Sequence, residues 1–247
     1  MAASFPILTF HAVDHRPSVI SFLPRVFEHG MALLHDSGYR TLSLVELTDC
    51  IRRRVSIPER SFVITFDDGY RSVYEHAFPV LQRHGMTATV FLTVGTTQQE
   101  RLPCMEGRSM LSWAQIKEMH RAGIAFGAHT LTHPDLTRLP AELLEVEVVG
   151  GKRVIEDALG SRVDTFAYPF GRYDNRCREL VSRHFLCACS DRLGLLRPST
   201  DFYAMERVDA YYLRTERLFH TMLSNWFPLY VQVRSIPRRI RRALYSV

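Results

Sequence analysis

The chain has 247 residues, of which 46% are hydrophobic and 23% are charged, the balance of a globular protein. This composition excludes a disordered, collagen-like or low-complexity chain, and no apolar run approaches the length of a membrane-spanning helix. The net charge of +5 comes from the C-terminal segment, because all 26 acidic residues lie at or before Glu216 and six arginines follow it. The rest of the chain is nearly neutral, which argues against nucleic-acid binding.

Strand-like and helix-like runs alternate along the whole chain. Short apolar and β-branched runs predict strands over residues 6–13, 41–44, 61–66, 87–94, 124–128, 164–168, 185–190 and 203–208. Apolar residues at helical spacing, with cap and stop residues, predict helices over 19–37, 43–54, 72–84, 112–122, 140–159 and 174–184. The polar residues 95–109 are expected to form a long loop.

This alternation predicts an α/β fold with a parallel sheet. Seven or more strands, with no glycine-rich phosphate loop, favour a closed barrel over an open sheet. We expect one barrel domain over residues 1–216 and a basic, amphipathic C-terminal extension over 217–247. Since barrel chemistry lies where strands end, the polar residues that follow the strands are the functional candidates.

Two adjacent carboxylates, Asp67 and Asp68, follow the predicted strand 61–66 in the segment Thr-Phe-Asp-Asp-Gly. Burying two like charges side by side costs free energy unless one of them is neutralised, for instance by a metal ion. An Asp-Gly pair is also a common turn signal, so a plain turn is the alternative interpretation.

Two histidines, His129 and His133, follow the predicted strand 124–128 at a spacing of four residues. Such a pair can face one point across a single turn. Neutral imidazoles together with a carboxylate form a common zinc triad that leaves a coordination position open. A solvated or capping histidine pair is the alternative, which a strand-end Asp-Asp pair in the same barrel makes less attractive.

A third polar and aromatic segment follows the predicted strand 164–168. It contains Tyr168, Pro169, Phe170 and Gly171, which predict a rigid wall beside a substrate. A plain Pro-Gly turn is the alternative.

Together, these three segments resemble the polysaccharide deacetylase family, the NodB-like carbohydrate esterases of family four. The resemblance rests on TFDDG at 65–69, HTxxHP at 129–134 and YPxG at 168–171, and it covers roughly residues 6–210. It implies a distorted, incomplete (β/α) barrel with about seven parallel strands, in agreement with the strand and helix pattern.

The resemblance also implies roles for individual residues. Asp68, His129 and His133 would bind one divalent metal, with zinc expected first and Fe²⁺, Co²⁺ or Ni²⁺ as alternatives. Asp67 would act as the general base on a metal-bound water that attacks an N-acetyl carbonyl. The backbone N–H of Tyr70 would stabilise the resulting oxyanion.

Cleavage of an amide also needs an acid that protonates the leaving amine. Many family members supply a histidine from a Leu-x-His motif near the C-terminal end of the domain, and no such motif occurs here. The segment Leu-Thr-Phe-His that ends at His11 resembles the permuted branch of exopolysaccharide deacetylases, in which the acid lies on the N-terminal strand. His11 is therefore the candidate acid, with a core or loop histidine as the alternative.

The sequence departs from the family pattern in two places. Many members carry an arginine in the third motif that pairs with the base, whereas this chain reads Ala-Tyr-Pro there. Arg207 and Arg172 are the candidates to replace that arginine. The aspartate that tunes the acid histidine has no clear match, and Asp191 and Asp209 are the nearest candidates.

The C-terminal extension combines an apolar stripe with arginines. Ile236, Ile240 and Leu244 recur at a spacing of four, and Arg238, Arg239, Arg241 and Arg242 lie between them. This pattern predicts either an interfacial helix on anionic lipid or a helix that packs on the barrel with its arginines exposed. RNA binding is a weaker third alternative.

We therefore expect a metal-dependent hydrolase that removes N-acetyl groups from an amino sugar, in a glycan or in its nucleotide-linked or lipid-linked precursor. The alternatives are a deformylase or other non-peptide amidase on the same site, and an inactive relative that binds glycan. The N-terminus lacks the basic and apolar regions of a secretory signal, so we expect a cytoplasmic protein, with the inner membrane face as a candidate location. We expect no nucleic-acid partner.

Overall fold

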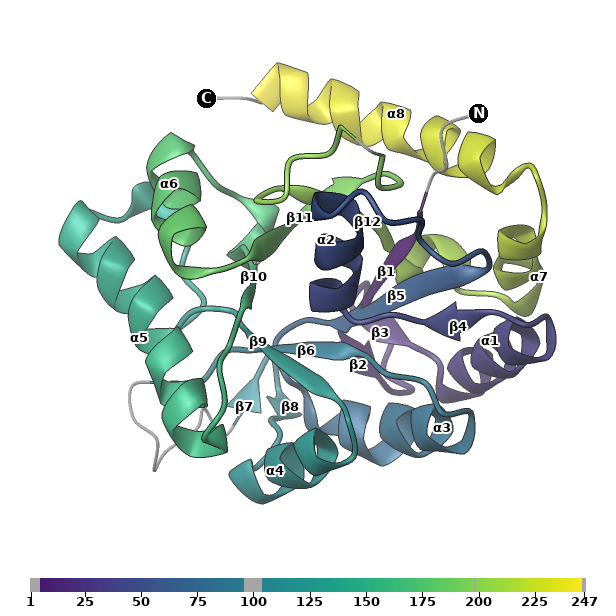
Figure 1. The fold of residues 1–247 in the computed structure, drawn as a ribbon, viewed down its shortest axis with the longest axis horizontal. Helices are drawn as coiled ribbons and strands as arrows, with labels where there is room; N and C mark the ends of the chain where they lie inside the picture. The colour runs from purple at the N-terminus through teal and green to yellow at the C-terminus, as the bar shows by residue number, and fades with distance from the viewer. Residues whose placement is uncertain (1–4, 96–103, 198, 246–247) are drawn as a thin grey trace.

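Seven parallel strands form a closed barrel (Figure 1) in this computed structural model, which describes residues 5–95, 104–197 and 199–245. Their order around the ring is β1-β12-β11-β10-β9-β6-β5, and β5 pairs with β1 to close it. The strands are β1 (Ile7–Phe10), β5 (Ser61–Phe66), β6 (Thr89–Leu92), β9 (Ala125–Ala128), β10 (Thr165–Ala167), β11 (Cys187–Leu193) and β12 (Met205–Asp209). The predicted α/β barrel is thus confirmed, and the ring has one strand fewer than a (β/α)₈ barrel.

Helices cover the outside of this ring (Figure 1). They are α1 (Pro24–Asp36), α2 (Leu44–Arg52), α3 (Phe78–Arg83), α4 (Trp113–Arg121), α5 (Ala141–Leu159), α6 (Asn175–His184), α7 (Glu216–His220) and α8 (Phe227–Tyr245). The predicted helix starts at Ser43, Ser112 and Asp174 are confirmed, because each side chain accepts a hydrogen bond from a backbone N–H of the first turn. Ser43 and Ser112 each form a reciprocal capping box.

The structure corrects two predicted segments. The helix predicted over 19–37 begins only at Pro24, because proline disfavours helical geometry at the residue before it. The residues ahead of it form β3 (Ser21–Phe22), which pairs with β2 (Ala12–Val13). In the predicted loop 95–109, residues 96–103 lie outside the described part of the chain, and the end of the loop is a hairpin of β7 (Cys104–Met105) and β8 (Arg108–Ser109).

The barrel interior has an apolar end and a polar end. Ile7, Val63 and Phe91 join one hydrophobic cluster with Leu44 and Leu47 of α2, and Phe91 extends this cluster up to Arg207, whose guanidinium carbon lies 5.9 Å from the centre of its ring. Figure 1 shows α2 lying across the apolar end of the barrel. Because strand side chains alternate, continuing the same inward face toward the C-terminal ends brings Asp67 and Arg207 to the other end of the interior.

The C-terminal helix α8 packs along the barrel beside β11 (Figure 1). Its own residues Phe227, Val231 and Ser235 face the barrel and are buried, each at most 6% exposed. The described residues of the connection from β11 to β12 form no helix, and α8 covers the strand that a regular β–α unit would cover. Within the described helices, none is long and apolar enough to cross a bilayer.

Candidate active site and metal centre

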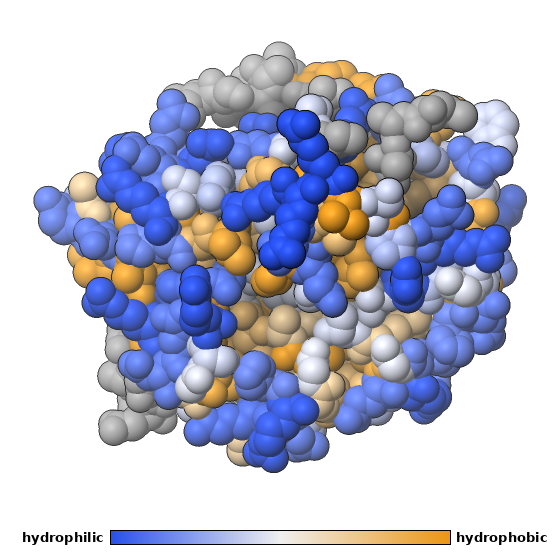
Figure 2. All heavy atoms as spheres, viewed as in Figure 1, coloured by the Kyte–Doolittle hydropathy of each residue, from blue (hydrophilic) through white to orange (hydrophobic). Residues whose placement is uncertain are grey.

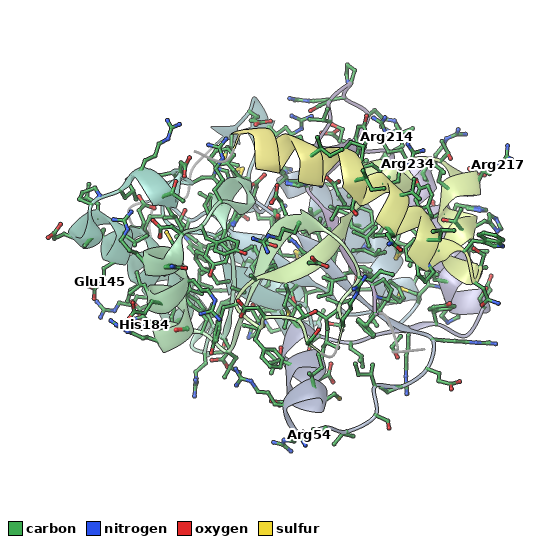
Figure 3. All side chains as sticks on the ribbon, turned by 90° about the horizontal axis from the view of Figure 1, so that it is seen from above. Arg54, Glu145, His184, Arg214, Arg217 and Arg234 are labelled. Carbon is green, nitrogen blue, oxygen red and sulfur yellow. The ribbon has the colours of Figure 1, made fainter. Side chains whose placement is uncertain are left out.

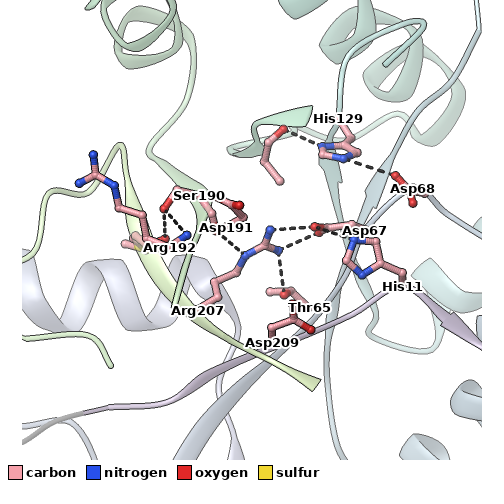
Figure 4. Close-up of polar contacts among 12 residues, drawn as sticks. His11, Thr65, Asp67, Asp68, His129, Ser190, Asp191, Arg192, Arg207 and Asp209 are labelled. Atoms are coloured by element: carbon pink, nitrogen blue, oxygen red, sulfur yellow. Dashed lines mark hydrogen bonds and ion pairs between the residues drawn. The ribbon is translucent and has the colours of Figure 1, made fainter. Parts of the chain in front are cut away.

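The candidate residues meet at the C-terminal ends of the barrel strands (Figure 4). His11 follows β1, Asp67 and Asp68 follow β5, and His129 follows β9. Arg207 lies within β12. Because parallel strands end at the same edge of a barrel, residues far apart in the sequence come together there.

Asp68, His129 and His133 form a group whose ligand atoms all lie within 4.8 Å of one another. Asp68 Oδ1 lies 3.5 Å from His129 Nε2 and 3.4 Å from His133 Nε2. His129 Nδ1 lies 2.7 Å from the Ala167 carbonyl oxygen, a contact that needs a proton on Nδ1 and leaves Nε2 to face Asp68. One carboxylate and two imidazoles fit a divalent metal such as zinc, and the fixed tautomer is typical of metal-binding histidines.

The two histidines meet through a bend in the backbone, not through the single turn expected from their spacing. Thr130 has a φ of 70° and His133 a φ of 61°, and Asp68 has a φ of 72°. Residues other than glycine rarely adopt such angles, and strain of this kind concentrates at functional sites.

Helix α5 holds this bend in place. Glu147 accepts hydrogen bonds from the backbone N–H groups of Leu131 and Thr132, both at 2.9 Å, and from the Thr132 hydroxyl. A Cβ at Gly151 would lie 2.9 Å from the Thr130 carbonyl carbon, so a larger residue would push the helix away from the bend. The geometry of His129 and His133 therefore depends on residues of α5.

The protonation of the group follows from burial and mutual charge. Burial and the neighbouring His129 lower the pKa of His133 to about 4, so this imidazole is neutral near pH 7. Burial alone would raise the pKa of Asp68, but the close approach of His129 and the other nearby histidines lowers it overall. Burial would lower the pKa of His129, but the carboxylates of Asp68 and Asp67 raise it overall. An ionised carboxylate beside a neutral imidazole matches the state in which these groups bind metal.

Asp67 forms a buried, bidentate ion pair with Arg207. Arg207 Nη1 lies 2.7 Å from Asp67 Oδ1, and Nη2 lies 2.7 Å from Oδ2. The guanidinium also donates to the Thr65 hydroxyl and to the Ser190 carbonyl. Burial would raise the pKa of Asp67, but the charge and hydrogen bonds of Arg207 hold it well below its usual range.

His11 faces the same carboxylate from the opposite side of the site (Figure 4). Its Nε2 lies 3.8 Å from Asp67 Oδ2, and its side chain is 28% exposed.

Tyr70 is buried, and burial together with Asp68 raises the pKa of its hydroxyl. Tyr70 and Met110 form an antiparallel bridge, in which the Leu111 N–H donates to the Gly69 carbonyl at 2.9 Å. This hydrogen bond makes Tyr70 and Met110 a non-hydrogen-bonded pair, so the Tyr70 N–H points away from the bridge.

The third segment divides between core and surface. Tyr168 is buried and its hydroxyl donates to the Tyr203 carbonyl at 3.0 Å, and Pro169 is buried beside it. Phe170 is 56% exposed with a φ of 57°, and its ring centroid lies 4.6 Å from that of His133. Of this segment, Phe170 is the side chain that borders the histidine pair. Gly171 is required by space, because a Cβ there would lie 2.1 Å from Asp191 Oδ1.

Two of the proposed substitutes, Arg172 and Asp209, have other partners than the candidate base and acid. Arg172 pairs with Asp135 at 2.7 Å and is well exposed, so it is Arg207 that contacts Asp67. Asp209 accepts a hydrogen bond from Arg238 at 2.8 Å and another from the Tyr211 N–H.

Two groups at the site, Glu147 and the Ala167 carbonyl, are not recognisable in the sequence. Glu147 lies in the middle of a long, acid-rich helix, where nothing in the spacing distinguishes it from solvent-exposed neighbours. A main-chain carbonyl carries no sequence signal at all, although its position at the end of the predicted strand 164–168 could have suggested a contact with the neighbouring strand end.

Comparison with known proteins agrees with this geometry. Residues 54–186 match the family described as polysaccharide deacetylase. YxkH of Bacillus subtilis (strain 168) is 29% identical over 207 residues, which are 83% of this chain and 71% of that protein. A poly-beta-1,6-N-acetyl-D-glucosamine N-deacetylase of Staphylococcus aureus (strain MSSA476) is 30% identical over 210 residues, 81% of this chain and 70% of that protein.

A solved structure shows the same relationship in three dimensions. The polysaccharide deacetylase BC0361 from Bacillus cereus has a TM-score of 0.76 and 27% identity, over 90% of this chain and 70% of that one. The barrel, the three motifs and these matches together define the class: the chain belongs to the polysaccharide deacetylase family. The family predicted from the sequence is confirmed.

Proposed function

We propose that the chain is a metal-dependent N-deacetylase that hydrolyses the acetamido group of an amino sugar within a glycan. The observation that supports this proposal most is that the two adjacent carboxylates have different partners. Asp68 lies beside two histidines, whereas Asp67 forms an ion pair with Arg207. The similar protein from Staphylococcus aureus is named for a β-1,6-linked polymer of N-acetylglucosamine, which makes this polymer the first substrate to test. Nucleotide-linked and lipid-linked amino sugars are the next substrates, because we expect a cytoplasmic protein.

In this proposal Asp68, His129 and His133 hold the divalent metal, with zinc first and Fe²⁺, Co²⁺ or Ni²⁺ as alternatives. When bound, the metal would acidify the attacking water and polarise the acetyl carbonyl. Arg207 lowers the pKa of Asp67 and keeps this carboxylate ionised, which is the state in which it can accept a proton from that water.

Asp67 would accept the proton of the attacking water. Each of its oxygens already accepts one hydrogen bond from Arg207 and keeps a second lone pair for water. The Tyr70 N–H would stabilise the oxyanion of the tetrahedral intermediate. His11 would protonate the leaving amine, since its Nε2 lies on the open side of Asp67, 3.8 Å away.

Replacing Asp67 with Asn tests the proposal on β-1,6-linked N-acetylglucosamine oligomers, with released acetate as the readout. We expect the rate to fall by a factor of order 10² or more while the metal content, measured by plasma mass spectrometry, stays at the wild-type level. His129→Ala is the companion variant, and we expect it to lose both metal and rate. Wild-type protein that takes up metal but releases acetate from none of the three substrate classes would contradict the proposal.

Two alternatives keep the same site. A deformylase or other non-peptide amidase would release formate or another acid from a different amide while still depending on Asp67. If the chain were a glycan-binding relative without turnover, the wild type and Asp67→Asn would bind oligomers with equal affinity. Comparing oligomer affinity and product release for these two proteins distinguishes the three functions.

A further inference from the structure

Helix α8 carries a second apolar face, which is about half exposed to solvent in the described part of the molecule. Leu229, Val233, Ile236 and Ile240 are between 48% and 55% exposed. Trp226, directly before the helix, is 71% exposed. Figure 2 shows hydrophobic residues at the edge of the molecule that α8 forms. We call the four helix residues the outer stripe.

The outer stripe lies almost opposite the face that packs on the barrel. Successive residues of a helix are turned by about 100°, so Val233 is turned by about 200° from the buried Val231. Spacings of four, three and four keep the stripe residues on a single line along the helix. A helix that only covers a barrel is usually mostly polar on this side, whereas α8 has four exposed apolar residues in one line.

Unpaired positive charge surrounds the stripe. No acidic residue occurs after Glu216, whereas six arginines do. Arg214, Arg217 and Arg234 are exposed, and Figure 3 shows them gathered around α7 and α8 on one side of the molecule. Within the described chain, no carboxylate lies within salt-bridge distance of any of these three.

We propose that the outer stripe of α8 docks on an anionic lipid surface. An apolar line flanked by arginines is the pattern of a helix that lies in a membrane interface, with its apolar side chains among the acyl chains and its cations at the headgroups. The same charges disfavour a second copy of this chain as the partner, because a symmetric pair places the same surface on both sides and would bring arginine against arginine. The proposal does not depend on deacetylase chemistry.

The docked orientation follows from the contacts of α8 with the barrel. Arg238 donates to Asp209 at the end of β12, and to the Asp191 carbonyl at 3.3 Å. These contacts fix α8 beside β11 and the end of β12, the strand that carries Arg207. A lipid surface in contact with the stripe would therefore lie on the outer side of α8, at the flank of the barrel formed by β11 and β12.

Vesicle cosedimentation of the full chain tests the proposal. We expect binding to phosphatidylcholine vesicles that contain about one-quarter phosphatidylglycerol, and none to phosphatidylcholine alone. Val233→Gln with Ile236→Gln should weaken binding at least about tenfold. Leu229→Gln with Ile240→Gln repeats the test with the other two stripe residues. Arg217→Gln with Arg234→Gln should weaken binding, and raised salt should do the same to the wild type.

A matched pair on another helix is the control. Leu143 and Val146 of α5 have the same spacing as Val233 and Ile236 and are 52% and 53% exposed. Leu143→Gln with Val146→Gln should leave vesicle binding unchanged. Absence of binding by the wild type, or equal weakening by the control pair, would overturn the proposal. So would a stripe-dependent dimer in analytical ultracentrifugation without vesicle binding, because it would assign the stripe to a second copy.

Discussion

Asp67 and Asp68 are neighbours in the sequence, yet different partners give them different chemistry. The left-handed backbone of Asp68 turns its carboxylate toward His129 and His133, while Asp67 continues the inward face of β5 toward Arg207. Two buried like charges thereby each gain a compensating group. The Arg207 pair is the strongest electrostatic constraint in the described interior, since both of its members are almost fully buried.

The first prediction concerns this ion pair. Arg207→Met should lower the free energy of unfolding by about 3–5 kcal/mol, because it leaves Asp67 buried without a counter-charge. Adding Asp67→Asn to that variant should recover part of the loss, since it removes the unpaired charge. Urea unfolding of the single and double variants measures both effects.

The control for this experiment is Arg172→Met. Arg172 is well exposed and pairs with Asp135 at the surface, so its replacement should change the free energy of unfolding by no more than about 1 kcal/mol. Equal losses in Arg207→Met and Arg172→Met would contradict the interpretation of Arg207 as the compensating charge.

At the scale of elements, α5 acts on the site through the bend between His129 and His133. Glu147→Gln removes one acceptor oxygen and adds a donor, so it cannot accept all three hydrogen bonds that the carboxylate accepts. We expect metal affinity to fall about 10- to 100-fold, as measured by competition with a chelator. Glu145→Gln is the control, since Figure 3 shows Glu145 at the outer surface of α5. An unchanged metal affinity in Glu147→Gln would show that the bend holds its shape without this helix.

The hairpin β7–β8 supplies a prediction about pH. Asp14 accepts a hydrogen bond from Arg108 of β8 at 2.8 Å. Burial raises the pKa of Asp14, but the hydrogen bonds from Ser21 and Arg108 outweigh burial, so the pKa is lowered overall. A carboxyl whose pKa is lowered by folding stabilises the protein above its unfolded pKa, about 3.9, and loses this effect as the pH falls through the folded value. Asp14→Asn should therefore lower the free energy of unfolding by roughly 1–3 kcal/mol at about pH 7.

The difference between Asp14→Asn and the wild type should shrink steadily below about pH 4. Thermal unfolding of both proteins across this range measures it. A difference that stays constant down to about pH 3 would mean that packing, and not the charge of Asp14, holds the hairpin.

Most elements were predictable because their signals are local. Side chains that can cap a helix predict the helix starts at Ser43, Ser112 and Asp174. The β-branched run 61–66 predicts a strand. The partnership of Asp67 with Arg207 was predictable only as one of two alternatives, because 140 residues separate them and the choice depends on which strands adjoin. The two faces of α8 could not be separated in the sequence, since an apolar residue has the same spacing whether it faces protein or solvent.

At the scale of the whole molecule, the apolar residues that stabilise the barrel and the charged residues of the candidate site occupy opposite ends of the barrel interior. The N-terminal end is filled with apolar side chains from the strands and from α2, and the C-terminal end carries the charged groups. Because the two ends share the same strands, the rigid apolar end fixes where the strand-end side chains point.

This separation yields the last prediction. Leu47 of α2 is fully buried in the apolar end, so Leu47→Ala should lower the free energy of unfolding by about 2–5 kcal/mol. Metal affinity should nevertheless stay within about threefold of the wild type at a temperature where the variant is folded, because the cavity opens at the end opposite the Asp68 group. Urea unfolding and chelator competition on the same preparation measure the two quantities. A loss of metal affinity as large as that of Glu147→Gln would mean that the apolar end sets the site geometry directly, and the separation of the two ends would fail.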